Sequence, residues 1–164
     1  MSPGSAQIDA ALEAAFPLEP RPPDKNIVYD ASGEHDECMQ VLADYAGRLW
    51  TDVPTDILGF NADALHFMTD EAFLYYLPAF IRKYLREREG ADLIPQQLIS
   101  MLTPGEADPA RFHFLETRSS NRQKQFIAAL LAHVRDEDPF YRPEAEAALS
   151  SYWQKALAEA NDPP

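Results

Sequence analysis

The segment from residue 64 to residue 85, ALHFMTDEAFLYYLPAFIRKYL, constrains the fold of this chain more than any other. It holds six of the eighteen aromatic residues, and from residue 72 to residue 81 every side chain is apolar or tyrosine. A helix that is apolar on all sides is normally buried. We therefore predict a central helix over residues 70–89, capped by Thr69, around which the other helices pack.

Pro78 lies inside this predicted helix. A proline there removes one backbone hydrogen bond and clashes with the carbonyl group of Leu74, at a cost of roughly 3 kcal/mol. Chains that accept this cost usually have a packing or positional reason for the kink that results. The sequence therefore predicts that the central helix is kinked at Pro78.

Apolar residues at helical spacing predict further helices, and the sequence shows no convincing strand and no internal repeat. Ser32 is expected to cap an amphipathic helix of about 18 residues that ends near Trp50. Ser120 and Gln123 form a predicted capping box. The FHFL segment, residues 112–115, is interpreted as an extended loop. The predicted architecture is all-α, with about five main helices in one compact domain.

This single domain is expected to span residues 1–164, since its length fits one domain. Residues 17–30 are predicted to be a proline-rich connector, because PLEPRPP at its start holds four prolines in seven positions. A stiff connector is the main interpretation, and a proline-rich ligand for a recognition module is the alternative. Residues 161–164 are expected to be frayed.

Location is predicted from three features of the sequence. No run approaches the roughly 18 uncharged apolar residues that a membrane span needs. The first sixteen residues have no basic start and no long apolar region, so they do not resemble a secretory signal. Cys38 is the only cysteine and cannot form an internal disulfide. A cytoplasmic protein that does not contact membranes is therefore expected.

The net charge of −13 is concentrated in the N-terminal half. Residues 1–81 carry 14 acids and 3 bases, a net charge of −11. Direct binding of nucleic acid is not expected, because neutralising phosphates requires a basic surface. A protein partner is expected, and opposite charge favours a basic one. Solubility alone is the alternative explanation of the charge, and the oligomeric state is left open.

Titratable residues give little indication of catalysis. No two of the four histidines have the i, i+4 spacing of paired metal ligands on a helix. His35, Cys38 and the nearby Glu34 and Glu37 have the chemistry to bind zinc. However, Cys38 fits the apolar face of its helix, and the surrounding acids oppose its ionisation. We predict no catalytic residue, cofactor or metal site, and expect that the chain is not an enzyme.

The aromatic residues provide the candidate binding site. Tyr75 and Tyr76 are the polar element of the predicted buried helix, and buried phenols require hydrogen-bond partners. The main interpretation is a packed core whose phenols bond to carboxylates or carbonyl groups. The alternative is an aromatic-lined groove for a ligand or a partner peptide. The candidate residues are Trp50, Phe73, Tyr75, Tyr76, Pro78 and Phe80.

The segment from Ala64 to Phe80, preceded by Trp50, resembles the motif ALxFxTxEAFxYYLPAF of a family of small acidic bacterial proteins catalogued as a domain of unknown function. Residues 112–131 are similar to a later loop and helix of that family. The resemblance spans residues 35–135, and Asp70 stands where the family usually has proline. It implies a helical fold and a bacterial origin, and it brings no activity and no catalytic residues.

We therefore expect a non-enzymatic interaction protein whose acidic N-terminal half binds a basic protein, in the manner of an antitoxin or immunity protein. The antitoxin or immunity role is suggested only by the general type of the chain, since some small acidic bacterial proteins have such roles. The alternative is a small enzyme or small-molecule binder with an aromatic pocket near Trp50, Tyr75 and Tyr76. An enzyme requires a deep pocket with convergent polar groups, whereas a binding module presents an exposed charged or apolar patch.

Overall fold

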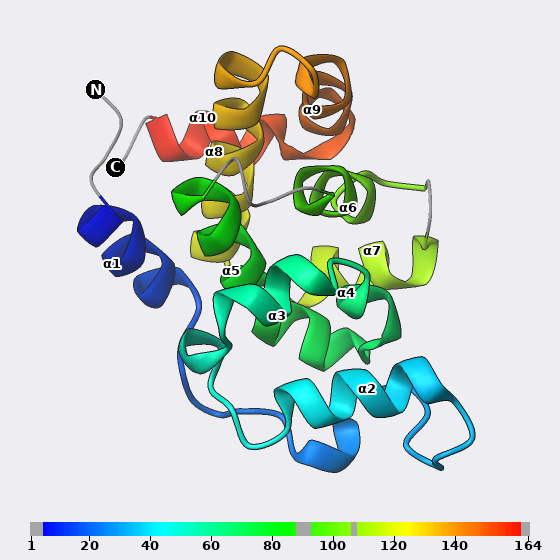
Figure 1. The fold of residues 1–164 in the computed structure, drawn as a ribbon. Coiled ribbons are helices and arrows are strands. Elements are labelled where there is room, and N and C mark those ends of the chain that lie inside the picture. The colour runs from blue at the N-terminus through cyan, green and yellow to red at the C-terminus, as the bar shows by residue number, and fades with distance from the viewer. Residues whose placement is uncertain (1–4, 88–92, 106–107, 162–164) are drawn as a thin grey trace. The chain divides into compact units, whose positions relative to one another are not determined.

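The computed structural model describes residues 5–87, 93–105 and 108–161. These residues form helices and connecting loops, and the β-pairing recorded among them is one antiparallel bridge between Val28 and Met68 (Figure 1). The predicted all-α class is confirmed. None of the described helices has both the length and the apolar composition that crossing a bilayer requires. The chain divides into two compact units, residues 1–94 and residues 95–164.

The first unit contains the aromatic helix, which spans residues 70–86. This helix, α5, contacts several other elements of the unit, and ten of its seventeen residues are buried. The elements of the unit are α1 (Ser5–Ala15), η1 (Asp24–Asn26), α2 (Asp36–Tyr45), η2 (Trp50–Asp52), α3 (Thr55–Phe60), α4 (Ala64–Phe67) and α5 (Asp70–Arg86).

Thr69 caps α5 as the sequence predicts. Its Oγ1 accepts a hydrogen bond from the Ala72 amide at 3.2 Å and donates one to the Asn26 carbonyl oxygen at 2.6 Å. Pro78 lies inside the helix and its ring is buried. The kink at Pro78 and the central position of the helix stay predictions. The helix ends at Arg86, and residues 88 and 89 of its predicted range lie outside the described residues.

The predicted 18-residue helix that begins after Ser32 is wrong. α2 runs only from Asp36 to Tyr45, and its N-cap residue makes no side-chain capping bond. Gly33 and Gly47 have φ angles of +93° and +73°, a left-handed conformation that interrupts a helix and that glycine adopts at little steric cost. The Ser32 hydroxyl instead accepts from the Glu34 amide at 3.2 Å, inside a turn.

The second unit also consists of helices. Its α8 begins at the predicted capping box, in which Ser120 and Gln123 exchange side-chain and backbone hydrogen bonds. A single π-helical turn, η4, joins α9 to α10 and places Trp153, whose Nε1 donates to the Leu102 carbonyl oxygen at 2.7 Å. The helices are α6 (Ile94–Met101), α7 (Pro109–Arg118), α8 (Asn121–Glu137), α9 (Arg142–Ala148), η4 (Leu149–Trp153) and α10 (Gln154–Asn161).

The extended loop predicted for residues 112–115 is wrong, because these residues lie within α7. The Asp108 side chain accepts a hydrogen bond from the Arg111 amide at 3.0 Å, and Pro109 occupies the first turn. An aspartate followed by proline is a typical helix start. The prediction of about five main helices is not confirmed, since the described residues form more and shorter ones. Of the tail predicted to fray, residues 162–164 lie outside the described residues.

Candidate functional site

The predicted aromatic site is a packed part of the first unit. Trp50, Phe73, Tyr76 and Phe80 are at most 1% exposed, Pro78 is buried, and Tyr75 is partly exposed. The indole Nε1 of Trp50 donates to the Phe16 carbonyl oxygen at 3.1 Å. The guanidinium carbon of Arg82 lies 5.3 Å from the centre of the Trp50 ring. Side chains and backbone thus occupy the surroundings of this indole.

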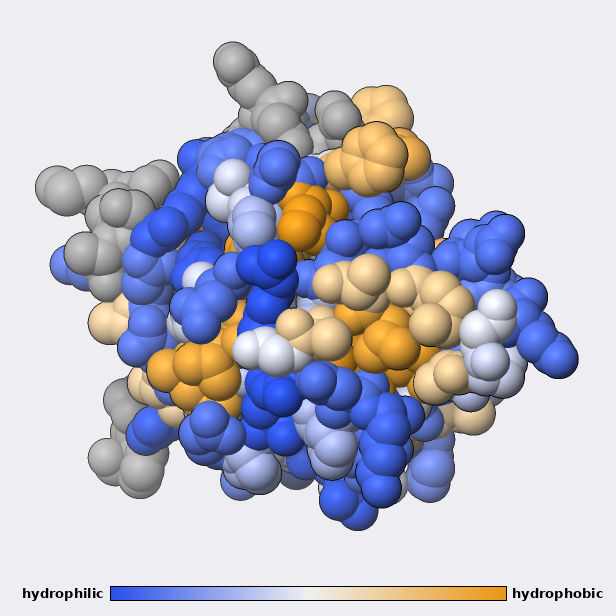
Figure 2. Space-filling model, turned by 60° about the horizontal axis from the view of Figure 1, so that its bottom comes forward, coloured by the Kyte–Doolittle hydropathy of each residue, from blue (hydrophilic) through white to orange (hydrophobic). Residues whose placement is uncertain are grey.

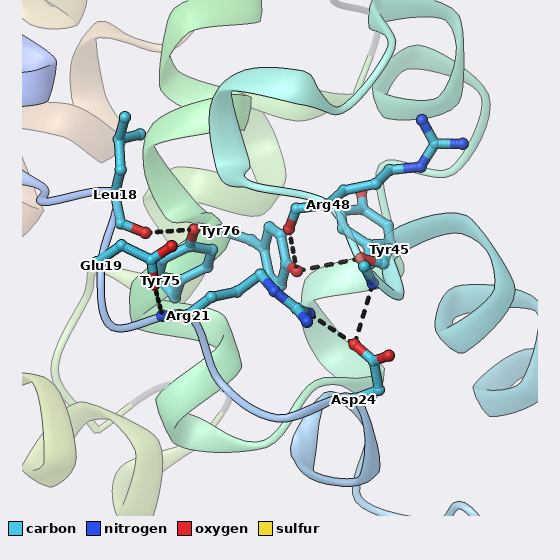
Figure 3. A network of polar contacts seen from close by, with 9 residues as sticks. Leu18, Glu19, Arg21, Asp24, Tyr45, Arg48, Tyr75 and Tyr76 are labelled. Atoms are coloured by element: carbon cyan, nitrogen blue, oxygen red, sulfur yellow. Dashed lines mark hydrogen bonds and ion pairs between the residues drawn. The ribbon is translucent and has the colours of Figure 1, made fainter.

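Both phenols of the tyrosine pair bond to backbone carbonyl groups, as the structural interpretation predicts (Figure 3). Tyr76 donates its hydroxyl to the carbonyl oxygens of Tyr45 and Arg48, at 3.1 and 2.9 Å. Tyr75 donates to the Leu18 carbonyl oxygen at 2.9 Å. Burial raises the pKa of Tyr76 to about 12, so this phenol stays protonated at neutral pH. The pair therefore fastens α5 to the segments around residues 18 and 45–48.

The connector crosses the tyrosine pair and is held by Asp24 (Figure 3). One carboxylate oxygen of Asp24 accepts from Arg21 Nη1 at 2.6 Å and from the Gly47 amide at 3.0 Å. The Arg21 hydrogen bond, followed by that of Gly47, lowers the pKa of Asp24 below its usual value. These contacts explain the position of the connector without a ligand.

The sequence did not predict an aromatic cluster that forms where the connector ends. The Tyr29 amide donates to the Phe67 carbonyl oxygen at 3.1 Å, and the Thr69 amide donates to the Ile27 carbonyl oxygen at 3.0 Å. This short pairing places the rings of Tyr29 and Phe67 6.4 Å apart in a stacked arrangement. The His35 ring lies 5.7 Å from that of Tyr29 and 5.8 Å from that of Phe67. We call these three residues the aromatic cluster.

Tyr29 is the most exposed member of the aromatic cluster, at 57%. Its hydroxyl lies 3.2 Å from His35 Nε2, within hydrogen-bond distance. His35 Nδ1 is 3.2 Å from Glu37 Oε2, so the two groups form an ion pair when the imidazole is protonated. The pKa of Tyr29 is raised above its usual value, chiefly by a hydrogen bond with the Cys38 thiol and next by burial. The charges of the nearby Asp30 and Glu37 act in the same direction.

The aromatic cluster borders a run of acids without basic residues. Between Lys25 and Arg48 the chain has five acids and no lysine or arginine. We call this the acidic segment. Within the described part of the chain, none of its carboxylates pairs with lysine or arginine. The five acids are Asp30, Glu34, Asp36, Glu37 and Asp44.

Other acids of the first unit do have basic partners. Asp9 pairs with Arg86, Asp24 with Arg21, and Glu87 with Lys83 at 2.5 Å. The acidic segment is therefore a surface of uncompensated negative charge beside exposed aromatic carbon. On the face drawn in Figure 2, hydrophilic side chains cover most of the surface, and hydrophobic ones gather in a few separate places.

Exposed carboxylates like those of the acidic segment attract a cation. Cys38 is fully buried, and among the described residues no group of three or more histidine, cysteine or acidic side chains is placed to hold a metal ion. The basic side chains near the end of α5 are largely engaged within the unit, since Arg82 also donates to the Thr51 carbonyl oxygen at 2.9 Å. Arg88, which follows α5 in the sequence, lies outside the described residues.

The chain matches a family of unknown function, DUF6714, over residues 24–157. The chain belongs to this family. The family resemblance inferred from residues 35–135 is thereby confirmed, while the bacterial origin and the motif stay predictions. The DUF6714 match begins at Asp24 and so includes the acidic segment, the aromatic cluster and α5. Comparison with the curated proteins and with the solved structures gives no match.

Two short segments of the sequence carry a signal for the aromatic cluster. The run IVY at residues 27–29 consists of β-branched and aromatic side chains, which favour extended pairing. Its partner, FMT at residues 67–69, lies about forty residues later, where α4 gives way to α5. Local patterns do not specify pairing over such a separation.

Proposed function

We propose that this member of DUF6714 is a non-enzymatic protein-interaction module that binds a basic protein through the acidic segment and the aromatic cluster. The observation that carries the proposal is the 57% exposure of Tyr29 beside carboxylates that no described lysine or arginine neutralises. We place the module in the bacterial cytoplasm, in keeping with its single cysteine, Cys38, which is fully buried.

Elementary electrostatics explains how such a surface selects its partner. Exposed carboxylates attract a basic protein before contact and raise its association rate, especially at low salt. Each exposed ion pair contributes at most about 1 kcal/mol, so affinity requires several pairs or an additional contact. Tyr29 offers that contact, because a lysine or arginine over an exposed aromatic ring gains about 0.5–1 kcal/mol.

The geometry of the tyrosine pair also favours a binding surface elsewhere in the unit rather than an aromatic pocket at α5. Tyr76 and Trp50 are fully buried and bonded to backbone carbonyl groups. Opening a pocket there would break these bonds, whereas a partner can reach Tyr29 with no rearrangement of the unit. We therefore place the contact at the surface of α2 and the turn before it. An antitoxin or immunity role is one form that binding of a basic protein would take.

The experiment that tests the proposal compares two triple variants with the same change in net charge. In the surface variant, Glu34→Gln, Asp36→Asn and Glu37→Gln neutralise the acidic segment. In the control variant, Glu116→Gln, Glu146→Gln and Glu159→Gln neutralise exposed acids of the second unit. Each full-length protein is used to capture partners from lysate of the native host at low and high salt, with quantification by mass spectrometry.

We expect the unmodified chain and the control variant to capture the same basic protein at low salt, and high salt to release it. The surface variant is expected to retain less than a fifth of it, and Tyr29→Ala to retain an intermediate amount. Equal losses in the two triple variants would show that net charge alone governs capture. A captured protein that is neutral or acidic, or that resists salt, would also overturn the proposal.

A further inference from the structure

The second unit contains a cavity that the proposed function does not use. It has a volume of about 480 Å³, which lies in the range of small-ligand sites. One wall is formed by one face of α6 and by Thr103, which follows that helix. The other wall is formed by α9 and the loop before it. The residues that carry the argument are Ile99, Ser100, Phe140, Tyr141, Glu144 and Ala147.

Helical spacing directs the polar side chains of both walls into the same space. Gln96, Ser100 and Thr103 recur at intervals of four and three residues, which places them on one side of α6 and its continuation. Tyr141 and Glu144 are three residues apart at the start of α9, and they line the cavity together. The cavity therefore has polar groups that converge from two separate elements.

Several of these polar groups have no partner within the described residues. No hydrogen bond or ion pair is recorded there for the side chains of Ser100, Tyr141 or Glu144, whereas the Thr103 hydroxyl donates to the Ile99 carbonyl oxygen at 2.6 Å. Burial, followed by the charges of Asp138 and Glu144, raises the pKa of Tyr141, so its hydroxyl remains a neutral donor and acceptor. These groups are available to a ligand.

The charge and the apolar surface of the cavity indicate what kind of ligand fits. Among the described residues that line it, Glu144 alone is charged, and its carboxylate attracts a cation and repels an anion. Ile99 supplies buried apolar surface, and the Phe140 ring, 78% exposed, lies edge-on to that of Tyr141 with their centroids 4.8 Å apart. Exposed aromatic carbon of this kind gains from contact with a cation or an alkyl chain.

We propose that this cavity binds an organic cation, an ammonium or guanidinium group on a short apolar stem. The cationic group pairs with Glu144 and bonds to the hydroxyls of Tyr141 and Ser100, while the stem lies against Ile99 and Phe140. A free alkylamine and the side chain of a lysine share this chemistry. The inference is independent of the proposed function, since the lining residues that the structure describes all belong to the second unit.

The test is a titration of the full-length, isotope-labelled chain, followed through backbone amide chemical shifts. The probes are n-pentylamine, n-pentanol and pentanoate, which share an apolar chain and differ in charge. We expect n-pentylamine to give saturable shifts confined to residues 96–103 and 138–147. We expect n-pentanol to bind at least fivefold more weakly and pentanoate to give no saturation.

Variants separate the cavity from the general acidity of the chain. Glu144→Gln should reduce the affinity for n-pentylamine to that for n-pentanol. Glu146→Gln, the same change two residues away on the same helix and outside the cavity, should leave it unchanged. Ala147→Leu fills part of the cavity and should weaken the binding of both n-pentylamine and n-pentanol. Unchanged amide spectra elsewhere would show that the three variants are folded.

Equal affinities for n-pentylamine and n-pentanol, equal losses in Glu144→Gln and Glu146→Gln, or shifts spread over the surface would each overturn the proposal. Two blocked tripeptides, Gly-Lys-Gly and Gly-norleucine-Gly, distinguish the sources of the cation. Tighter binding of the lysine peptide than of n-pentylamine assigns the site to a protein side chain. Weaker binding of that peptide assigns the site to a free amine.

Discussion

The Tyr76 hydroxyl lies 2.9 Å from the carbonyl oxygen of Arg48, a residue 28 positions earlier in the chain. The same hydroxyl lies 3.1 Å from the Tyr45 carbonyl oxygen, and both carbonyl groups belong to the stretch where α2 ends and the chain turns. One phenolic proton is therefore shared between two acceptors. The buried surface of α5 is tied in this way to the segment that precedes Trp50.

Removing the hydroxyl of Tyr76 should destabilise the protein. Tyr76→Phe removes this donor from two carbonyl oxygens, of which that of Tyr45 keeps the Arg48 amide at 3.1 Å, and the expected cost is about 1–2 kcal/mol. Tyr75→Phe is the matched control, because its hydroxyl has one acceptor and the side chain is partly exposed. Denaturant unfolding at neutral pH measures both. Equal losses of unfolding free energy in the two variants would show that burial of the hydroxyl does not increase its contribution to stability.

Thr69 should contribute to stability through two hydrogen bonds, one to α5 and one to the connector. Thr69→Ala removes both and is expected to cost about 1–2 kcal/mol in the free energy of unfolding. Thr69→Ser keeps the hydroxyl and should recover most of this loss. Thermal unfolding followed by circular dichroism measures the difference. A serine variant as unstable as the alanine variant would assign the effect to the lost methyl group.

Pro78→Ala should leave the fold intact and stabilise it slightly. The substitution restores an amide that can bond to the Leu74 carbonyl group, a gain of up to about 3 kcal/mol. It also removes two buried carbon atoms, a loss of about 0.8 kcal/mol each. We expect a net gain of about 1 kcal/mol in denaturant unfolding. Pro54→Ala, outside any helix interior, should give no such gain. Destabilisation by Pro78→Ala would show that the ring itself is required.

Asp24 should make the stability depend on pH in the acid range. Its pKa is lower in the folded state than its usual 3.8, chiefly because Arg21 bonds to the carboxylate. The resulting stabilisation is present above the usual pKa and is lost as the pH falls from there through the lowered value. Asp24→Asn should therefore flatten the acid limb of a stability profile, and Arg21→Gln should flatten it similarly. An unchanged slope below pH 4 in both variants would contradict this assignment.

Much of the helical structure could be predicted, because its signals are local. The hydroxyls of Thr69 and Ser120 cap α5 and α8 as expected, since a capping side chain bonds to amides only two or three residues away. The errors are also local in origin. Left-handed glycines at positions 33 and 47 shorten α2, and the start signal of Asp108 and Pro109 was outweighed by the short apolar run that follows it.

The sequence by itself determined that the apolar helix face within residues 72–81 would be buried, because an apolar helix cannot remain in water, and that the phenols of Tyr75 and Tyr76 would need acceptors. Only the tertiary structure decided which carbonyl groups accept those bonds and that Tyr29 meets Phe67. Both depend on contacts between residues tens of positions apart, whose register is set by loops that local propensity does not specify. The candidate surface and the cavity of the second unit are products of that packing.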